Sequence, residues 1–168
     1  MKPRVHIIGG PGSGKTYIAS RLAGHFNIQQ HDLDDLFWDK NATTYGVKSE
    51  TSTRDRQLSV IVASEGWVIE GVYFQWLGQS FDKADVIIAL TPSIWIRHLR
   101  IVKRFILRKT GSLPNKRESL ADLWRLLVWG HWYDKRNLVR VEAFINSRGL
   151  KMQRAKNLKE VSRIIEAL

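Results

Sequence analysis

The sequence contains no cysteine and no long hydrophobic run. Without cysteine among its 168 residues, the chain can form neither disulfides nor thiolate metal sites, and it has no cysteine nucleophile. Nothing therefore argues for secretion, and we expect a reducing, cytoplasmic location. The longest uncharged stretches, such as Val86 to Ile96, fall well short of the about 18 to 20 residues that a membrane span needs, so no membrane partner is expected. No repeat or flexible linker is visible, which predicts a single domain over residues 1–168.

Acidic residues are missing between Asp85 and Glu118. Basic residues fill this interval: Arg97, Arg100, Lys103, Arg104, Arg108, Lys109, Lys116 and Arg117. The whole chain has 27 Lys and Arg against 16 Asp and Glu, a formal net charge of +11. A solvated helix face usually mixes both signs, so the segment over residues 97–117 predicts an anion-binding surface. Nucleic acid, acidic lipid or a phosphorylated small molecule would fit its charge.

Short apolar runs alternate with segments of helical spacing. Strands are expected at Val5 to Ile8, Ile28 to Asp32, Trp67 to Glu70, Val86 to Leu90 and Leu150 to Arg154. Helices are expected at Tyr17 to His25, Arg54 to Ser64, Ser93 to Lys109, Ser119 to about Ser147, and Leu158 to Leu168. Continuous apolar strands are typical of a parallel sheet that is buried on both faces. The order predicts an α/β fold of three layers, with five strands and helices on both faces.

Two helices have a distinctive pattern of apolar residues. The helix after Ser93 repeats Ile94, Trp95, Leu99, Val102 and Ile106 at helical spacing, and its opposite face is basic. In the next helix, Trp124, Trp129 and Trp132 recur at helical spacing with Leu127, Val128 and Tyr133. That spacing favours packing in the core or in a lid over stacking on nucleic acid bases, which stays the alternative. The five histidines show no metal-ligand spacing and receive no role.

The segment from Gly9 to Thr16 reads GGPGSGKT and matches the phosphate-binding P-loop pattern. Its glycines let backbone amides surround phosphate oxygens, and the helix that follows adds partial positive charge. Lys15 is predicted to reach the β- and γ-phosphates of ATP, and the Thr16 hydroxyl to bind Mg²⁺. The predicted nucleotide-binding residues are Gly9, Gly10, Pro11, Gly12, Ser13, Gly14, Lys15, Thr16 and the adjacent Tyr17.

Three carboxylates follow predicted strands. Glu70 closes one apolar run, and Asp32 and Asp34 come directly after another. Ligands of open α/β sheets gather at the carboxyl ends of the strands, so all three are candidates for the site. Asp32 or Glu70 would serve the metal together with Thr16, and the sequence does not choose between them. For Asp32 and Asp34 a turn or a helix cap is the alternative role.

In these segments the chain resembles the P-loop NTPases of the nucleoside-monophosphate-kinase-like (adenylate-kinase-like) family, and within it the group of DNA topology modulation (FlaR-like) proteins. The segments are VHIIGGPGSGKT from Val5 to Thr16, DLDDLFW from Asp32 to Trp38, WVIEGVY from Trp67 to Tyr73, ADVIIALTPSIWIRHLRIVKR from Ala84 to Arg104, and YDKRN from Tyr133 to Asn137. The resemblance implies strand order 2-3-1-4-5, a small acceptor-side insertion at residues 33–66 and a helical lid at about residues 105–136.

The resemblance also implies roles for single residues. Asp34 would face the phosphoryl acceptor, and Arg54 or Arg56 would contact it. Arg100 and Arg104 would bind phosphates beside the lid. Arg136 would lie where the chain comes back from the lid, and Arg154 would lie near the adenine. Adenylate kinases carry an arginine after the third strand, in an Asp-Gly-Phe-Pro-Arg-like sequence. This chain has Glu70-Gly71-Val72-Tyr73 there, which argues against an adenine nucleotide as acceptor, and Asp32-x-Asp34 resembles kinases of the shikimate and gluconate type.

Two functions of different classes follow from the sequence. The first is an ATP- and Mg²⁺-dependent phosphotransferase, in which Lys15, Asp34, Arg100, Arg104 and Arg136 act on a small acceptor, either a nucleotide or a hydroxyl metabolite. The alternative is a nucleotide-regulated nucleic-acid-binding protein that influences DNA topology through the basic segment at residues 97–117. The oligomeric state is left open.

Overall fold

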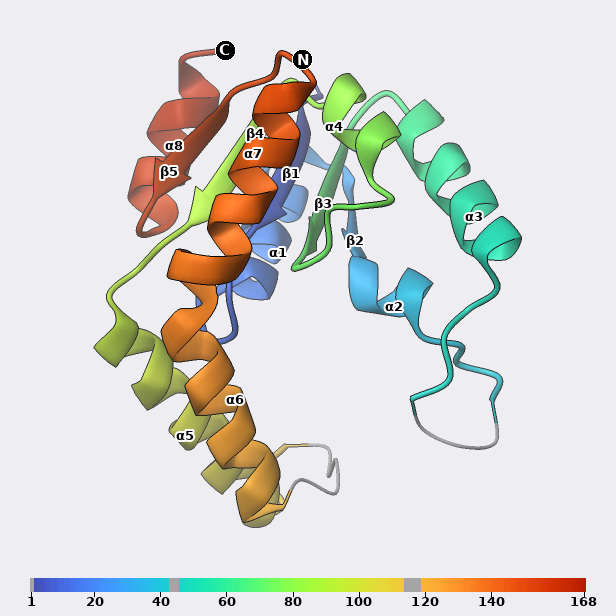
Figure 1. Cartoon of the computed structure of the whole chain (residues 1–168). Coiled ribbons are helices and arrows are strands. Elements are labelled where there is room, and N and C mark those ends of the chain that lie inside the picture. Colours follow the sequence, from blue (N-terminus) through green and yellow to red (C-terminus); the bar gives the residue numbers. More distant parts are fainter. Residues whose placement is uncertain (1, 43–45, 114–118) are drawn as a thin grey trace.

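The centre of the molecule is a five-stranded sheet (Figure 1), as seen in a computed structural model that describes residues 2–42, 46–113 and 119–168. The strands lie in the order β2-β3-β1-β4-β5, and all neighbouring pairs are parallel. They are β1 (Arg4–Ile8), β2 (Gln29–Asp32), β3 (Trp67–Gly71), β4 (Val86–Leu90) and β5 (Met152–Ala155). The predicted α/β class, strand number and strand order are confirmed.

Helices cover both faces of this sheet (Figure 1). They are α1 (Lys15–Phe26), α2 (Leu33–Phe37), α3 (Thr51–Ala63), α4 (Gly78–Lys83), α5 (Ile94–Lys109), α6 (Leu120–Tyr133), the π-helical segment η1 (Asp134–Leu138), α7 (Val139–Ser147) and α8 (Leu158–Glu166). On one face, α1 and α8 bury Leu22 and Val161 against the strands. On the other face, α3, α4 and α7 bury Leu58, Phe81 and Ile145. The central strands β1, β3 and β4 are mostly apolar because both of their faces are covered.

Two short helices and a π-helical segment were not predicted from the sequence patterns. The helices α2 and α4, of 5 and 6 residues, lie where an irregular segment and a loop were expected, because periodicity cannot be read over so few residues. The long helix expected to about Ser147 is observed as the contiguous run α6, η1 and α7, and the five residues of η1 within it have π-helical geometry. Its predicted start is confirmed, because Ser119 and Asp122 cap α6 reciprocally. The predicted break from Gly111 to Lys116 lies partly outside the described residues.

The helices α5 and α6 lie side by side and project past the carboxyl ends of the strands (Figure 1); we call this pair the arm. Within the apolar stripe of α5, Trp95 and Leu99 lie outside the core, with side chains that are 77% and 70% exposed. Arg97, Ile101 and Phe105 are buried instead. The pattern assumed that charges face water, but the Arg97 guanidinium is bound to a carboxylate and can therefore be buried.

The tryptophans of α6 also lie outside the core. Trp124 is 69% exposed and Trp132 is 40% exposed, so of the two predicted settings, core or lid, the core is not the one observed. They line an open groove on α6 together with Trp129. Tyr133, in the same pattern, is fully buried. Only one side of α6 rests on a neighbouring helix, so a helical repeat of aromatic residues did not have to mean burial.

No helix within the described ranges has both the length and the apolar character needed to cross a membrane.

Candidate functional site

The loop between β1 and α1 has the geometry of a phosphate cradle. The backbone N–H of Ser13 donates to the carbonyl oxygen of Gly10 at 3.2 Å, which closes the turn. Gly12 and Gly14 have φ angles of 73° and 93°, in the left-handed region that glycine adopts readily. A Cβ on Gly12 would also lie 2.5 Å from the carbonyl oxygen of Arg97. Since α1 begins directly after the loop, its unpaired amides and helix dipole favour an anion there.

Lys15 connects this cradle to the carboxylates. Its Nζ donates to the carbonyl oxygen of Gly10 at 3.3 Å, so the side chain folds back over the loop. Burial lowers the pKa of Lys15, while Glu70, Asp32 and Asp34 act in the opposite direction through their charges. The structure therefore brings the predicted phosphate lysine and all three candidate carboxylates into one electrostatic environment.

Glu70 lies at the end of β3 and is only 2% exposed. Burial raises the pKa of its carboxyl group, and a hydrogen bond with Thr16 partly offsets that rise. Its Oε1 has no hydrogen-bond partner among the described residues. A carboxylate oxygen in this state, next to the Thr16 hydroxyl, fits the hard oxygen ligands that Mg²⁺ prefers. The described residues contain no cluster of three or more acidic or histidine side chains that could hold a metal ion alone.

Asp32 is the register partner of Glu70 on the neighbouring strand β2. Its side chain accepts the backbone N–H of Asp34 at 2.9 Å and caps α2, so the alternative role as a helix cap is the one observed. Burial raises the pKa of the Asp32 carboxyl. This cap fixes α2 at the strand end and thereby places Asp34 beside the site.

Asp34 is held by a residue to which the sequence gave no role. The Tyr73 hydroxyl donates to Asp34 Oδ1 at 2.7 Å, and the Tyr73 ring stacks on Phe37 with centroids 4.3 Å apart. Burial and the contact with Asp34 raise the pKa of the Tyr73 hydroxyl, which keeps it protonated as a donor. The predicted acceptor-side carboxylate is thus oriented by an aromatic pair.

Arg54 and Arg56 both belong to α3 but have different surroundings. The Arg54 guanidinium sits 4.4 Å from the ring centroid of Trp76 and donates to the Asp55 carboxylate at 2.8 and 2.9 Å. Trp76 neighbours Tyr73 at 6.1 Å, so Arg54 belongs to the same aromatic cluster as the Asp34 anchor. Arg56 lines a different hollow with Val60. Of the two predicted acceptor contacts, Arg54 is therefore the one that lies near the residues that hold Asp34.

The arm brings arginines to the loop from the other side. Arg100 donates from Nη1 to the carbonyl oxygens of Gly12 and Ser13, at 3.3 and 3.0 Å. The charge of Arg104 depresses the pKa of Lys15, which places that arginine within electrostatic reach of the phosphate lysine. Arg136, in η1, lies over the Trp132 ring at 5.0 Å, and its contact with phosphates stays a prediction.

Arg97 corrects the expected basic surface. Its guanidinium donates two hydrogen bonds to the Asp134 carboxylate, at 2.9 and 2.7 Å, and the side chain is only 2% exposed. It is therefore not part of an exposed anion-binding face. Lys116 and Arg117, at the other end of that segment, lie outside the described residues.

Two further predicted contacts lie at the edge of the site. Tyr17 is 62% exposed on the first turn of α1. Arg154, on β5, donates to Glu142 of α7 at 2.7 Å. The proposed roles of both residues toward the nucleotide stay predictions.

Sequence reasoning missed the supporting residues of the site. Tyr73 and Asp134 stand inside motifs that were recognised, but neither position carried a signal of its partner. Arg97 was counted with the surface charges, since no local pattern pairs it with a residue 37 positions away. Only the tertiary contacts reveal these side chains.

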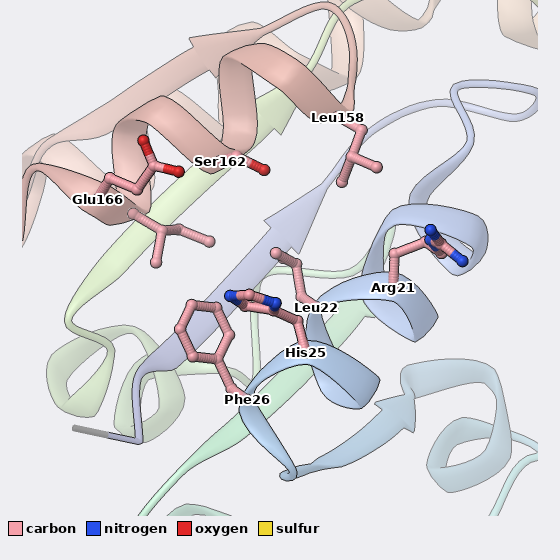
Figure 2. A pocket seen from close by; sticks show the side chains of 8 residues that line it. Arg21, Leu22, His25, Phe26, Leu158, Ser162 and Glu166 are labelled. Atoms are coloured by element: carbon pink, nitrogen blue, oxygen red, sulfur yellow. The ribbon is translucent and has the colours of Figure 1, made fainter.

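A separate cavity of about 200 Å³ lies between α1 and α8 (Figure 2). His25 and Phe26 line it from α1, and Ser162 and Glu166 line it from α8. None of the phosphate-loop residues lines this cavity, so it is not part of the candidate site.

Part of the chain is similar to a curated kinase. No family model matches the chain. A stretch of 76 residues is 36% identical to a shikimate kinase of Corynebacterium jeikeium (strain K411), covering 43% of this chain and 40% of that protein. The matched region therefore spans less than half of the length of this curated relative. A gluconokinase structure from Sinorhizobium meliloti 1021 aligns over 96% of this chain and 87% of its own, with 19% identity and a TM-score of 0.49. An uncharacterized protein from Eubacterium ventriosum ATCC 27560 aligns over 97% and 95%, with 16% identity and a TM-score of 0.57.

The sheet order, the phosphate loop and the partial similarity to a shikimate kinase agree with one another. The narrower resemblance to the DNA topology modulation group stays a prediction. The chain has a P-loop NTPase fold of the kinase-like kind.

Proposed function

We propose that this protein is an ATP- and Mg²⁺-dependent phosphotransferase that acts on a small acceptor. One observation carries the proposal. Lys15 lies over the phosphate loop within the field of Glu70 and Asp32, at two neighbouring strand ends, and of Asp34 in the helix α2 that follows. A site that only stored nucleotide would not need a third carboxylate, outside the metal region, that is anchored by its own tyrosine. The partial similarity to a shikimate kinase supports the same reaction class.

The donor side is formed by the loop and the strand ends. The loop amides and Lys15 would hold the phosphates of ATP, and Lys15 would leave the Gly10 carbonyl to do so. Thr16 and Glu70, assisted by Asp32, would hold Mg²⁺, which when bound offsets the charge of the phosphates. Bringing a metal ion next to Glu70 favours its ionised form and removes the cost of keeping this carboxylate buried.

The acceptor side is formed by Asp34 and its support. Asp34 would accept a hydrogen bond from an acceptor hydroxyl and orient that oxygen toward the γ-phosphorus. As the new P–O bond forms, the bond from phosphorus to the leaving ADP oxygen breaks, and the hydroxyl proton passes to Asp34. Tyr73 fixes the carboxylate through its 2.7 Å hydrogen bond, so less orientational freedom remains to be lost in the transition state.

The arm would supply the positive charge that the transferring group requires. Arginine is suited to this role because its planar fork binds pairs of phosphate oxygens and stays ionised. Arg100 already contacts the loop backbone, and Arg104 lies within electrostatic reach of Lys15. Arg136 would join them from η1. The roles of all three toward phosphate are part of the proposal.

The test is an acceptor screen that follows ADP release. Purified protein is given ATP and Mg²⁺ with nucleoside monophosphates and with hydroxyl metabolites, including hydroxy acids and sugar acids. We expect at least one acceptor to raise ADP release and to appear as a phosphorylated product by mass spectrometry. Lys15→Ala should abolish both signals, and Asp34→Asn should abolish transfer while nucleotide still binds. If Lys15→Ala leaves every acceptor-dependent signal unchanged, the proposal is wrong.

A further inference from the structure

The two ends of the arm meet directly beside the phosphate loop. Arg97 lies in the first turn of α5, and Asp134 lies where α6 passes into η1. Their side chains form a bidentate ion pair, with Nη1 to Oδ1 at 2.9 Å and Nη2 to Oδ2 at 2.7 Å. The rest of both arm helices projects away from the sheet (Figure 1). The pair therefore clasps the arm at its base.

The same base lies against the loop itself. A Cβ on Gly10 would lie 2.9 Å from the ring of Tyr133 and 3.1 Å from Nη1 of Arg97. A Cβ on Gly12 would lie 2.5 Å from the Arg97 carbonyl oxygen. Neither position leaves space for a larger side chain, so the loop cannot shift far unless the arm base shifts with it.

The second helix of the arm makes a matching contact. Gly130 of α6 is buried, and a Cβ there would lie 3.1 Å from Pro11 of the loop. The loop is thus enclosed by α5 on one side and by α6 with η1 on the other. A π-helical segment such as η1 is rare, and such segments are often found at functional sites. Here it begins at the residue that completes the clasp.

Two polar atoms near the clasp are buried without partners. Arg97 Nε and the Tyr133 hydroxyl have no hydrogen-bond partner in the part of the chain that the structure describes. Leaving buried donors unsatisfied costs stability. A different arrangement of the loop and the arm that gave these two groups partners would therefore recover that stability.

We propose that Arg97 and Asp134 are positioning residues that couple the phosphate loop to the arm. When the loop rearranges around a triphosphate, the clasp moves the bases of α5 and α6 together, and the arm arginines move with them. The inference rests on the proposed function in one respect, namely that the anion which fills the loop is a nucleotide. Neither clasp residue needs to touch the substrate, because Asp134 acts through Arg97 and Arg97 acts through Gly10 and Gly12.

The test measures hydrogen exchange by mass spectrometry in peptides from the loop and from the arm, with and without Mg²⁺ and a non-hydrolysable ATP analogue. Asp134→Asn weakens the clasp. Because it leaves the Arg97 charge buried, a double variant, Arg97→Met with Asp134→Leu, removes both charges and is expected to fold. The matched control is Asp82→Asn, which breaks the bidentate pair of Asp82 with Arg148 between α4 and α7. Asp134→Glu serves as the conservative rescue.

Without nucleotide, the loop peptide should exchange faster in both clasp variants than in wild type and in the Asp82→Asn control. With the analogue, hydrogen exchange in α5 and α6 of the wild type should become slower. Coupling between communicating sites usually amounts to about 5- to 150-fold, and we expect the factor by which exchange slows to lie in that range. That factor should fall toward 1 in the clasp variants and recover in Asp134→Glu. In turnover assays, kcat at saturating ATP should drop more than the affinity for ATP.

A purely structural pair would leave the nucleotide response of the arm unchanged in the folded double variant. That result, or equal loop exchange in the double variant and the control, would overturn the proposal. If wild type binds no nucleotide at all, the proposed function fails instead, and the comparison without nucleotide alone decides on the clasp.

Discussion

Acidification should destabilise this protein through His6, a residue in β1 that is fully buried. Its Nδ1 lies 3.1 Å from the Ser80 hydroxyl, and that hydroxyl donates to the Leu77 carbonyl at 3.0 Å. With the single Ser80 hydrogen given to Leu77, His6 donates from Nδ1 and Nε2 carries no proton; the tautomer is assigned from this hydrogen bond. Nε2 has no partner among the described residues. A proton added there would place an unpaired charge beside Phe81, whose ring centroid is 4.5 Å away.

The magnitude follows from the pKa of this imidazole. Burial lowers the pKa of His6 from 6.5 to about 3. The unfolded chain therefore takes up a proton between these values while the native state does not, and the free energy of unfolding falls as pH falls through that window. Between pH 7 and pH 4.5 the loss from this group amounts to about 2.5 kcal/mol, and it would exceed 4 kcal/mol, roughly, by pH 3.

The assay is urea denaturation of wild type and of His6→Leu at several pH values. The leucine variant does not titrate at this position, so subtracting its free energy of unfolding removes the contribution of all other groups. We expect the wild-type advantage to shrink by about 2.5 kcal/mol between pH 7 and pH 4.5. A difference that stays constant to within about 0.5 kcal/mol would refute the reasoning, because the histidine would then be protonated in both states or in neither.

Three further predictions concern the site. Glu70→Gln should raise the free energy of unfolding at pH 7 by about 1 kcal/mol, because burial raises the pKa of this carboxyl and its ionised form is costly to bury. Urea denaturation at pH 4 should show a smaller gain in the free energy of unfolding. Mg²⁺-dependent turnover should fall in the same variant. Gly12→Ala should cost at least about 1 to 2 kcal/mol, since its φ of 73° and the 2.5 Å approach to the Arg97 carbonyl both oppose a side chain; thermal unfolding and nucleotide titration check this, and an unchanged midpoint would contradict it. Tyr73→Phe should lower kcat/KM for the acceptor about tenfold by removing the hydrogen bond to Asp34 while KM for ATP stays constant, a difference of about 1.4 kcal/mol in steady-state kinetics; equal losses for both substrates would argue against an acceptor role.

Local sequence was enough to locate most elements. The predicted strand Val86 to Leu90 has the same bounds as β4. A short continuous run of apolar residues is typical of a strand that is covered on both faces of a parallel sheet. The order of the strands came from the resemblance of the whole chain and not from any single run. The helices α2 and α4 were missed, since five or six residues do not define a period.

The arm is where local patterns failed, and the reason is electrostatic. Trp95 and Leu99 have the spacing of a buried face, yet α5 turns that face to solvent. The choice between two faces of α5 depends on whether Arg97 finds a carboxylate inside, and Asp134 provides it. A helical pattern cannot contain that information, because the partner lies on another element.

For the candidate site, the sequence alone predicted the phosphate loop, with Lys15 and Thr16, and the three carboxylates at or just after strand ends. These follow from chain-local chemistry, since a loop between a strand and a helix and the last residue of a strand are read directly along the chain. Only the tertiary structure decided that Asp32 caps α2, that Tyr73 holds Asp34, and that Arg97 and Asp134 close the base of the arm. In each of these contacts, a partner side chain offsets the cost of burying a polar group or fixes its orientation. The partner is brought into reach only when the helices and strands pack together.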